Sequence, residues 1–560
     1  MAKLTINKNT MKTTKFLFSA ITCLIVGLNT QAQRTDRFVN LGGTGTQVTV
    51  NGGVSFPDKT AELQNLINTN KKNIKLNGNM TLGEIALSSN VHIDIKKGVV
   101  IKLKTTNGRG LMFRGGKEVT DAAIENVKIY CSECSTLPSD NNKSAERYTI
   151  DMSSGTPDEN CNFVSFGKVT NFSLSQFYVI DNYTKINAIT LATNVKDNTA
   201  TGDVWTRSYT VQAAPTQGDI KLGYLKNGHV GYGLLQVQAA KNVNFHNLTS
   251  QGGVSLRLES GSTIAVVPTT EGSAANMDNL EGYNIVGING WSAVTLSPHG
   301  RRHGAISLKN ITAIGCSSAI RIIGGFQDRD VEGLPNFPTA KYKRGNFGSV
   351  TITGTIKHTY GTTAQLEGRD FSYFPQSLIK NKTLEQVFPK AAPYIAPFDG
   401  ADARINTPSI ATVLYFSKDS AAASPRDIDG QYSVNLTGAT LEKPGFNSCI
   451  PTTIYANDKN KICSSTSKFS IDYDETALDT KREIFSFETL DNTISVSTKV
   501  ITIHLTKDSN IIIYNSIGKT IKTVIASAGI TEINASNFAN GIYIVSIQQE
   551  GNIIKKKIIL

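Results

Sequence analysis

The strongest constraint on the fold is a short strand pattern that recurs from about residue 40 to residue 325. Apolar or β-branched segments alternate with Gly, Asn or Asp turns, and three segments align so that Leu258, Leu296 and Ile322 occupy one position. A unit that cannot bury its own apolar face must stack on copies of itself. The number of residues between these aligned positions is not constant. An irregular repeat favours a parallel β-helix over a propeller, and a twisted β-sandwich is the main alternative.

Composition and one amphipathic segment agree with a solenoid. The chain has 560 residues with 47 Gly, and β-branched runs dominate over runs with helical spacing. The exception is Asp58–Asn68, where Leu63, Leu66 and Ile67 lie on one side of a helix. A helix there can cover the open end of the stack, whose backbone groups would otherwise be unpaired. We expect an all-β protein with one helical cap.

The N-terminus has the features of an export signal. Lysines precede an apolar run from Phe16 to Leu28, and Ala32 provides a small residue at the cleavage position. The run is too short to span a bilayer comfortably, so a membrane anchor is the less favoured alternative. We therefore expect no transmembrane segment in the mature chain.

Export places the six cysteines after the leader in an oxidising compartment, where disulfides persist. Local pairs are favoured: Cys131 with Cys134, and Cys449 with Cys463, while Cys161 could pair with either member of the first. A zinc site at Cys131 and Cys134 is the alternative, but no second Cys or His pair follows at a suitable distance. Metal ligands stay unassigned.

The end of the chain is a separate small β unit. It contains the strand Gly541-Ile542-Tyr543 and ends on Lys555-Lys556-Lys557-Ile558-Ile559-Leu560. It resembles the type A sorting domain of the type IX secretion system, which implies a small β-sandwich, contact with that machinery and a secreted or cell-surface protein. A carbohydrate-binding module is the alternative. The expected boundaries are a signal peptide at 1–32, a β-helix at 33–463 with insertions at about 326–430, a linker at 464–483 and a sorting domain at 484–560.

Charged and polar side chains align on one outer face of the predicted β-helix. Because side chains alternate along a strand, Leu256 and Leu258 in the core send Arg257 and Glu259 outward. The same alternation, applied to the strand before and the two strands after, sends Gln236, His299 and Arg321 to the same outer face. The resulting strip consists of Gln236, Arg257, Glu259, His299 and Arg321. One carboxylate among cations suits protonation of a leaving oxygen beside a polyanion, and a solvated face with an ordinary ion pair is the alternative.

The motifs around this strip resemble those of a known enzyme family. They are Gly233-Leu-Leu-Gln236-Val-Gln, Gly253-Val-Ser-Leu-Arg257-Leu-Glu259-Ser-Gly261 and Ala293-Val-Thr-Leu-Ser-Pro-His299-Gly. They are similar to the core motifs of the ι-carrageenases, glycoside hydrolase family 82, over roughly residues 35–460. The resemblance implies a right-handed parallel β-helix of the pectate-lyase type, with inserted loops and a subdomain that wall a groove. It also implies inverting hydrolysis of the β-1,4 bonds of a sulfated galactan, most closely ι-carrageenan.

The resemblance also implies roles for single residues. Glu259 would be the general acid, Gln236 would help hold the water or an ion, and His299 would line the same centre. No cofactor is needed for the chemistry, while a structural Ca²⁺ or Na⁺ ion and a bound chloride are compatible with the family. We expect a monomer with no nucleic-acid partner.

The net positive charge of the chain and its arginines support an anionic substrate. Positive side chains exceed negative ones by 12, which in an exported protein favours an acidic partner. Sulfate esters stay ionised, and the guanidinium fork matches their oxygens. The residues expected to bind them are Arg257, Arg321, Arg301, Arg302 and His303, with a packing role as the alternative for His303.

One position departs from the family pattern. Relatives place an Asp that acts as general base two residues after the acid, and here that position is Gly261. An inverting hydrolase needs a second group to activate water. Asp278, Glu281 and Asp328 are candidates; otherwise water is held without a strong base, or the chain is inactive.

Two rival functions stay open. A polysaccharide lyase on the same scaffold would use an Arg base and Ca²⁺ held by several Asp, although no outward Asp cluster accompanies the strip. A noncatalytic glycan-binding surface protein is the second rival, and the glycine in place of the base favours it.

Overall fold

The computed structural model describes residues 36–197, 209–260, 276–326, 344–367, 404–421 and 430–458 and, with short gaps, 492–559. The predicted signal peptide lies outside the described residues. The chain divides into two compact units, residues 1–468 and 469–560, and the division falls inside the predicted linker.

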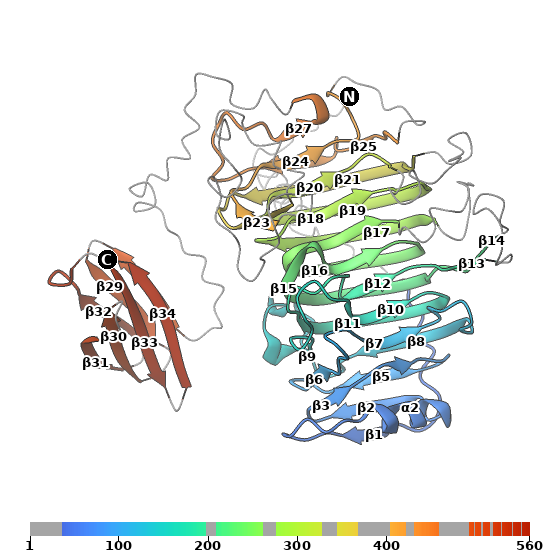
Figure 1. Cartoon of the computed structure of the whole chain (residues 1–560), viewed down its shortest axis with the longest axis horizontal. Coiled ribbons are helices and arrows are strands. Elements are labelled where there is room, and N and C mark those ends of the chain that lie inside the picture. Colours follow the sequence, from blue (N-terminus) through green and yellow to red (C-terminus); the bar gives the residue numbers. More distant parts are fainter. Residues whose placement is uncertain are drawn as a thin grey trace, which may run out of the picture. The chain divides into compact units, whose positions relative to one another are not determined.

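The first unit is a right-handed parallel β-helix in which each coil passes through three sheets, named A, B and C (Figure 1). Sheet A contains β1 (Val48–Asn51), β2 (Asn73–Asn77), β5 (His92–Ile95), β8 (Ile124–Tyr130), β25 (Val434–Asn435) and the first parts of β11 (Val169–Ile180), β15 (Thr216–Val237), β16 (Ala240–Glu259), β17 (Met277–Ile288), β19 (Arg302–Ile314) and β21 (Asn346–Thr359). Sheet B contains β3 (Met80–Leu82), β6 (Val100–Leu103), β9 (Tyr148–Asp151), β26 (Ala439–Glu442) and the following parts of the same long strands. Sheet C contains β4 (Ile85–Ala86), β7 (Gly110–Gly115), β10 (Cys161–Phe166), β12 (Ile189–Leu191), the last parts of β15 and β16, β18 (Ser292–Ser297), β20 (Ser318–Ile322), β24 (Ala411–Tyr415) and β27 (Thr453–Tyr455). The β-helix prediction is confirmed, and the β-sandwich alternative is wrong for this unit.

The register of sheet C is the one that the sequence alignment predicts. Leu258 pairs with Leu296, and Leu296 pairs with Ile322. All three side chains are fully buried in one continuous apolar core. The alternation therefore sends the residues between them to the outer face of the sheet.

The corner between sheets A and B explains part of the asparagine content. Asn247, Asn284 and Asn310 each adopt a positive φ, between 53° and 57°, a conformation that Asn tolerates better than most residues. Their side chains also form a ladder: Asn284 Nδ2 donates to Asn247 Oδ1 at 3.0 Å, and Asn310 Nδ2 donates to Asn284 Oδ1 at 3.3 Å. The ladder fixes neighbouring coils in register.

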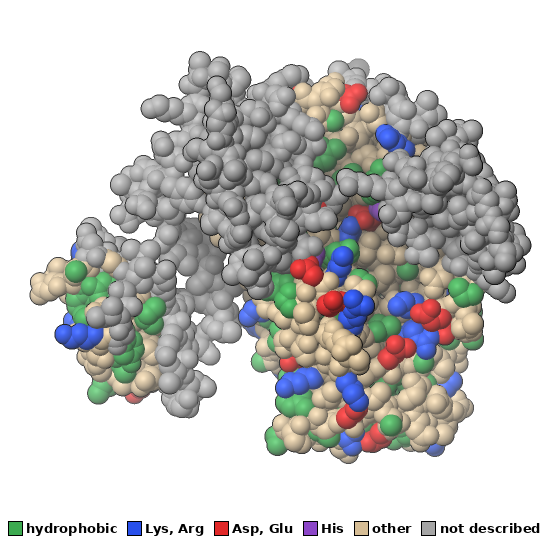
Figure 2. Space-filling view, viewed as in Figure 1, with side chains coloured by type: hydrophobic (Ala, Val, Ile, Leu, Met, Phe, Trp, Pro, Cys, Tyr) green, Lys and Arg blue, Asp and Glu red, His purple; other side chains and the backbone are tan. Residues whose placement is uncertain are grey.

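The positive surplus is not gathered into one patch on the face shown in Figure 2, where Lys and Arg side chains lie next to Asp and Glu. Elsewhere on the described surface the pairing is explicit, with Lys104 Nζ 2.8 Å from Asp58 Oδ2 and Lys97 Nζ 2.6 Å from Glu146 Oε2. Exposed pairs of this kind contribute little to stability. Binding of an anionic substrate would therefore depend on a particular site and not on the overall surface charge.

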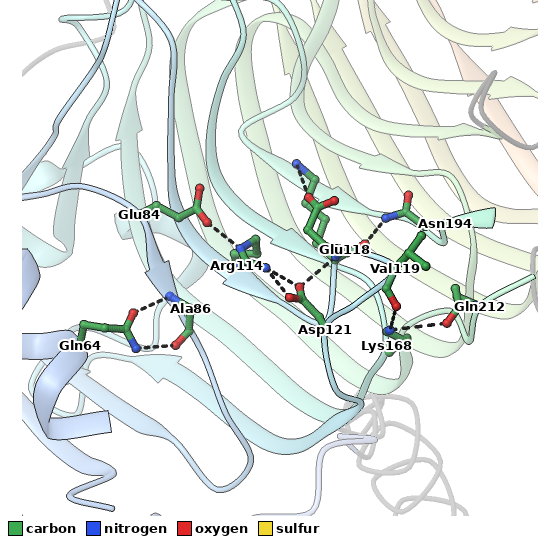
Figure 3. Close-up of polar contacts among 11 residues, drawn as sticks. Gln64, Glu84, Ala86, Arg114, Glu118, Val119, Asp121, Lys168, Asn194 and Gln212 are labelled. Atoms are coloured by element: carbon green, nitrogen blue, oxygen red, sulfur yellow. Dashed lines mark hydrogen bonds and ion pairs between the residues drawn. The ribbon is translucent and has the colours of Figure 1, made fainter. Parts of the chain in front are cut away.

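The predicted cap is helix α2 (Thr60–Asn68), which lies at the β1–β2 end of the stack (Figure 1). Leu63 and Ile67 are buried against the first coil. Gln64 Nε2 donates to the Ala86 carbonyl at 3.1 Å, and the Ala86 N–H donates to Gln64 Oε1 at 2.8 Å (Figure 3). The helix thus satisfies backbone groups at the end of the stack. Among the described residues, no helix has the length and apolar character needed to cross a membrane.

Long connections follow the sheet C strands β12, β16, β20 and β24. One of them carries the hairpin β13 (Val195–Asp197) and β14 (Tyr209–Val211). A further long connection, between β21 and β24, carries the antiparallel hairpin β22 (Ala364–Glu367) and β23 (Arg404–Thr407). Connections on a rigid scaffold commonly build functional sites, so the surroundings of sheet C are where a site is expected.

The cysteines follow the predicted local pairing in part. Cys131 and Cys134 form a disulfide, so the zinc alternative is wrong for this pair. Cys161 is a buried free thiol, as is Cys316, so the alternative pairing of Cys161 is wrong. Cys449 is also in a disulfide, and its predicted partner Cys463 lies outside the described residues.

The second unit has two antiparallel sheets around its own apolar core. One contains β28 (Asn492–Ser497), β29 (Val500–Leu505) and β32 (Gly529–Asn534), and the other contains β31 (Thr520–Ala526), β30 (Ser509–Asn515), β33 (Ile542–Gln549) and β34 (Asn552–Ile559). Ile503, Ile513 and Val545 are fully buried between them. This architecture is the small β-sandwich that the sequence predicts.

Candidate active site

A row of outward residues crosses sheet C in strict register, and we call it the outer row. It consists of Arg114, Ser165, Thr190, Gln236, Arg257, Thr295 and Arg321. Neighbouring strands lie about 4.8 Å apart, so Arg257 and Arg321, two strands apart, are separated by about 10 Å along the row. Glu259 lies two residues beyond Arg257 on the same face, paired with Ser297.

Glu259 is held by two neighbours. Arg257 Nε donates to Glu259 Oε2 at 2.9 Å, and Arg257 Nη2 donates to Oε1 at 2.5 Å. His299 Nε2 lies 3.2 Å from the same Oε1. The His299 backbone N–H donates to Ser260 Oγ at 3.0 Å, and its ring packs against Phe326 with a centroid distance of 4.1 Å. The structure therefore brings the predicted acid, His299 and Arg257 into one cluster.

The strip is not a solvated face. Gln236 is 5% exposed, and Arg257 and Glu259 are each 8% exposed. Burial alone would raise the pKa of Glu259, but the Arg257 guanidinium and then the His299 ring outweigh it and hold that pKa well below its usual range. Without substrate, the predicted acid is therefore a carboxylate, and donation of a proton requires a change at Arg257.

Aromatic rings fix both arginines of the row. The Arg257 guanidinium carbon lies 4.9 Å from the Tyr232 ring centre, and that of Arg321 lies 3.8 Å from the Trp291 ring centre. Cation–π contacts of this kind strengthen when they are shielded from water. The rings leave the two guanidinium groups in fixed positions along the row.

The hairpin β22–β23 reaches the same region. Gln365 Oε1 accepts a hydrogen bond from the Gly253 N–H at 2.6 Å, and Gln365 Nε2 donates to the Gly228 carbonyl at 3.0 Å. Two residues on, Glu367 is 7% exposed, and its Oε1 lies where a Cβ on Gly231 would be only 2.6 Å away. A second buried carboxylate thus lies beside the irregular part of β15 that precedes Gln236.

Gly231 links this hairpin to the cluster. Its carbonyl accepts a hydrogen bond from Arg257 Nη1, and its N–H donates to His229 Nδ1 at 3.2 Å. His229 Nε2 is 2.8 Å from Asp158 Oδ1, so the ring is held from both sides. The pairing fixes the proton of His229 on Nε2, because Nδ1 accepts.

Arg301, Arg302 and His303 lie in and after the turn that follows β18. Arg301 is 1% exposed, and its carbonyl accepts from the Asn346 N–H at 3.0 Å. His303 Nδ1 accepts from the Met277 N–H at 3.0 Å, and its ring packs on Phe347. Burial, then Arg301 and His299, lowers the pKa of His303 to about 3. This geometry favours the packing role for His303, and the sulfate contacts of all three residues stay predictions.

The predicted base candidates are engaged elsewhere or undescribed. Asp278 Oδ1 accepts from the Ala305 N–H at 2.9 Å, and Glu281 Oε1 is 3.0 Å from Arg37 Nη2. Both lie on β17, which pairs with the sheet A and B parts of β16, whereas Glu259 ends the sheet C part. Asp328 and Gly261 lie outside the described residues.

The far end of the outer row is Arg114 (Figure 3). Its Nε donates to Glu84 Oε1 at 2.6 Å, and its Nη1 lies 2.5 Å from both oxygens of Asp121. Asp121 Oδ2 also accepts from the Glu118 N–H at 2.9 Å. This arginine pairs with two carboxylates at the surface, and nothing in its surroundings points to a sulfate.

Sequence reasoning missed Glu367, Gln365 and the two aromatic rings under the arginines. The alternation of Gln365 and Glu367 in Ala-Gln-Leu-Glu was a readable strand signal. No pattern in the neighbouring sequence indicated that this strand packs against β15. Tyr232 and Trp291 each follow a glycine just before a strip motif, but no alternation rule assigns them to the face beneath an arginine.

Metal ligation finds no support among the residues that the structure describes, where no three His, Cys, Asp or Glu side chains lie close enough to hold an ion. The Ca²⁺, Na⁺ and chloride ions implied by the resemblance therefore stay predictions.

Together the coils and the site define a class: a right-handed parallel β-helix with a buried acid, histidine and arginine cluster on the outside of one sheet. Comparison with known proteins is more particular. The chain is 31% identical over 291 residues to an ι-carrageenase of Zobellia galactanivorans, which covers 51% of this chain and 53% of the relative. It is 27% identical over 250 residues to an ι-carrageenase of Alteromonas macleodii, covering 45% of each. The resemblance to the ι-carrageenases is confirmed, and the chain spans about half the length of the curated relatives it matches.

Solved structures agree on the fold. An ι-carrageenase complexed to ι-carrageenan fragments has a TM-score of 0.57 at 20% identity and covers 76% of this chain and 94% of its own. A family GH82 ι-carrageenase from A. fortis, determined in the absence of chloride ions, has a TM-score of 0.57 at 19% identity with the same coverage. Residues 497–560 match the family model of the secretion system C-terminal sorting domain. The predicted type IX sorting domain is confirmed, and the protein is secreted or attached to the cell surface.

Proposed function

We propose that this protein is a glycoside hydrolase that cleaves the β-1,4 bonds of a sulfated galactan, most closely ι-carrageenan, after export by the type IX machinery. The observation that carries the proposal is the buried Arg257–Glu259–His299 cluster on the outer face of sheet C. The similarity to two ι-carrageenases supports the substrate class. No step of the proposed chemistry needs a bound ion.

The arginines are suited to an anionic chain. Arg257 and Arg321 are about 10 Å apart along one row, so an extended polysaccharide lying across the strands can present one sulfate to each. Both guanidinium groups are held on aromatic rings, which lowers the entropy lost on binding. Gln236 lies on the next strand of the same row and offers an amide to the sugar or to water.

Sulfate binding provides the change that Glu259 needs in order to act as an acid. In the free protein both carboxylate oxygens accept donors from Arg257. A sulfate ester competes for the same guanidinium fork, and transfer of those donors to the sulfate raises the pKa of the carboxyl group. Glu259 then carries the proton that it gives to the leaving oxygen, while His299 keeps the carboxyl group oriented.

Inversion is the stereochemical part of the proposal. Water attacks the anomeric carbon from the face opposite the leaving oxygen, so the product has the inverted configuration. Nuclear magnetic resonance of the first product, recorded before mutarotation, tests this directly.

The defining experiment is a turnover panel of ι-carrageenan, κ-carrageenan, agar and alginate with the purified mature protein. We expect new reducing ends from ι-carrageenan and none from alginate. A product that absorbs in the ultraviolet would establish a lyase, because elimination creates a double bond. Binding without reducing ends on every polymer would establish the noncatalytic glycan-binding alternative.

A further inference from the structure

We propose that Glu367 is the general base of this hydrolase and does the work of the aspartate that Gly261 replaces. The inference rests on the proposed function and adds a catalytic residue that the strip motifs do not contain. It comes from the place where hairpin β22–β23 meets the irregular part of β15 before Gln236.

The hairpin is fixed on the β-helix by backbone contacts. Gln365 bonds the Gly253 N–H and the Gly228 carbonyl, one group on each of the neighbouring strands β16 and β15. Side chains two residues apart in a strand lie on the same face, so Glu367 points toward the β-helix like Gln365. Its 7% exposure agrees with this direction.

The carboxylate of Glu367 lies next to the space that a side chain at Gly231 would occupy. A Cβ on Gly231 would be 2.6 Å from Glu367 Oε1, so a larger residue there would require the Glu367 side chain to move. The carbonyl of Gly231 accepts from Arg257 Nη1, while Arg257 Nε and Nη2 bond Glu259. The same guanidinium therefore has Glu259 on one side and the Gly231–Glu367 contact on another.

Glu259 and Glu367 both act electrostatically on Arg257, and the assignment requires them to be spaced as in an inverting hydrolase. Inverting enzymes keep their carboxyl groups roughly 6.5–9.5 Å apart so that a water fits, against about 5–5.5 Å in retaining enzymes. Burial would lower the pKa of Arg257, but Glu259 and, to a smaller extent, Tyr232 and Glu367 raise it instead, so Arg257 stays charged.

The reaction balances with water as the only co-reactant. Glu367 takes one proton from water, the water oxygen bonds to the anomeric carbon, and the glycosidic bond to the leaving oxygen breaks. Glu259 gives its proton to that oxygen. Glu367 then releases its proton to solvent, and Glu259 is protonated again when the next sulfate engages Arg257.

The test is the variant Glu367→Gln in the full-length mature protein, assayed on ι-carrageenan. We expect kcat to fall by roughly 10²–10⁴-fold, the usual contribution of a general base, with little change in KM. Glu442→Gln, which neutralises an exposed carboxylate on β26, is the matched control and should stay within about twofold of the parent enzyme.

A second variant separates chemistry from folding. Sodium azide needs no base, so it should restore turnover to Glu367→Ala and yield a glycosyl azide of inverted configuration. A variant that merely fails to fold is not rescued by azide, and Glu259→Ala should not be rescued on the same substrate.

Three results would overturn the assignment: activity of Glu367→Gln within a few-fold of the parent, no azide rescue of a folded Glu367→Ala, or a retained product. Absence of turnover by the parent protein would refute the proposed function itself, and the role of Glu367 with it.

Discussion

Arg114 and Arg257 occupy the same row of the same sheet, and each is bound by carboxylates, yet their surroundings differ. The Arg114 side chain is 20% exposed and pairs with Glu84, whose side chain is 49% exposed. The side chains of Arg257 and Glu259 are 10% and 11% exposed, and a tyrosine ring lies beneath the guanidinium. The β-helix repeats the position but not the environment.

The difference shows what converts an ion pair into a candidate active site. Solvent screens the charges around Arg114, so that pair stabilises little and changes little when a ligand arrives. At Arg257 the low exposure makes each charge depend on its partner, so displacement of one donor changes the proton affinity of the other group.

The largest expected effect is on catalysis. Glu259→Gln should lower hydrolysis of ι-carrageenan by at least roughly 10²–10⁴-fold, because the amide keeps the shape but carries no acidic proton. Glu84→Gln, at the Arg114 end, should leave the rate unchanged. Reducing-end assays measure both, and binding of ι-carrageenan should survive in each variant. Full activity in Glu259→Gln would remove it as the acid.

The next largest effect is expected on the free energy of unfolding, which should fall more when Arg257 is replaced than when Arg114 is replaced. Arg257→Met leaves the Glu259 carboxylate buried without its main partner, which should cost about 3–5 kcal/mol at neutral pH. Arg114→Met should cost no more than about 1 kcal/mol, since its partners are better solvated. Urea unfolding followed by circular dichroism measures both.

The pH dependence checks the cause of the Arg257 effect. The pKa of Glu259 is depressed in the folded protein, so its pairing stabilises above the ordinary Glu range and is lost as pH falls. The cost of Arg257→Met should therefore shrink at acid pH. If replacing Arg257 and replacing Arg114 destabilised the protein equally, or if the effect at Arg257 did not depend on pH, the proposed difference between the two arginines would be wrong.

The fold was predictable because its rules are local. Alternation and recurring turns placed Leu258, Leu296 and Ile322 in one register, and that register alone sent Arg257 and Arg321 to one face. The cap α2 followed from helical spacing in the same way. Burial of this face could not be predicted, because alternation separates core from exterior and does not show which exterior face an insertion covers.

The site was predictable only as far as the strip itself. His299 lies beyond the end of β18, and parity still placed it near Glu259. Glu367 comes from an insertion whose return to β15 depends on tertiary contacts of Gln365, which no periodicity encodes. The depressed pKa of Glu259 likewise depends on a side-chain geometry that a sequence does not contain.

Asp181 offers a third buried carboxylate with the opposite electrostatics. It is 3% exposed and accepts from Thr184 Oγ1 at 2.7 Å, and burial raises its pKa to about 7. The folded chain therefore holds a proton between the ordinary Asp range and pH 7 that the unfolded chain has lost, so stability falls as pH rises through that window. Relative to Asp181→Asn, the parent should lose up to about 4 kcal/mol between pH 4 and pH 8. Urea titrations at both pH values measure this difference, and parallel pH profiles would show that Asp181 is ionised when folded.

The smallest expected effect is at Gly261. If Glu367 already supplies the base, Gly261→Asp adds a second carboxylate where relatives keep theirs and should change kcat by less than about threefold. In a Glu367→Gln background the same substitution should restore activity by roughly tenfold or more, because the chain regains a group that can take the proton from water. The two measurements therefore depend on each other, and only their combination is informative. A large gain from Gly261→Asp alone would mean that the present chain lacks an effective base, which would contradict the role of Glu367 while keeping Glu259 as the acid and the contrast between Arg257 and Arg114.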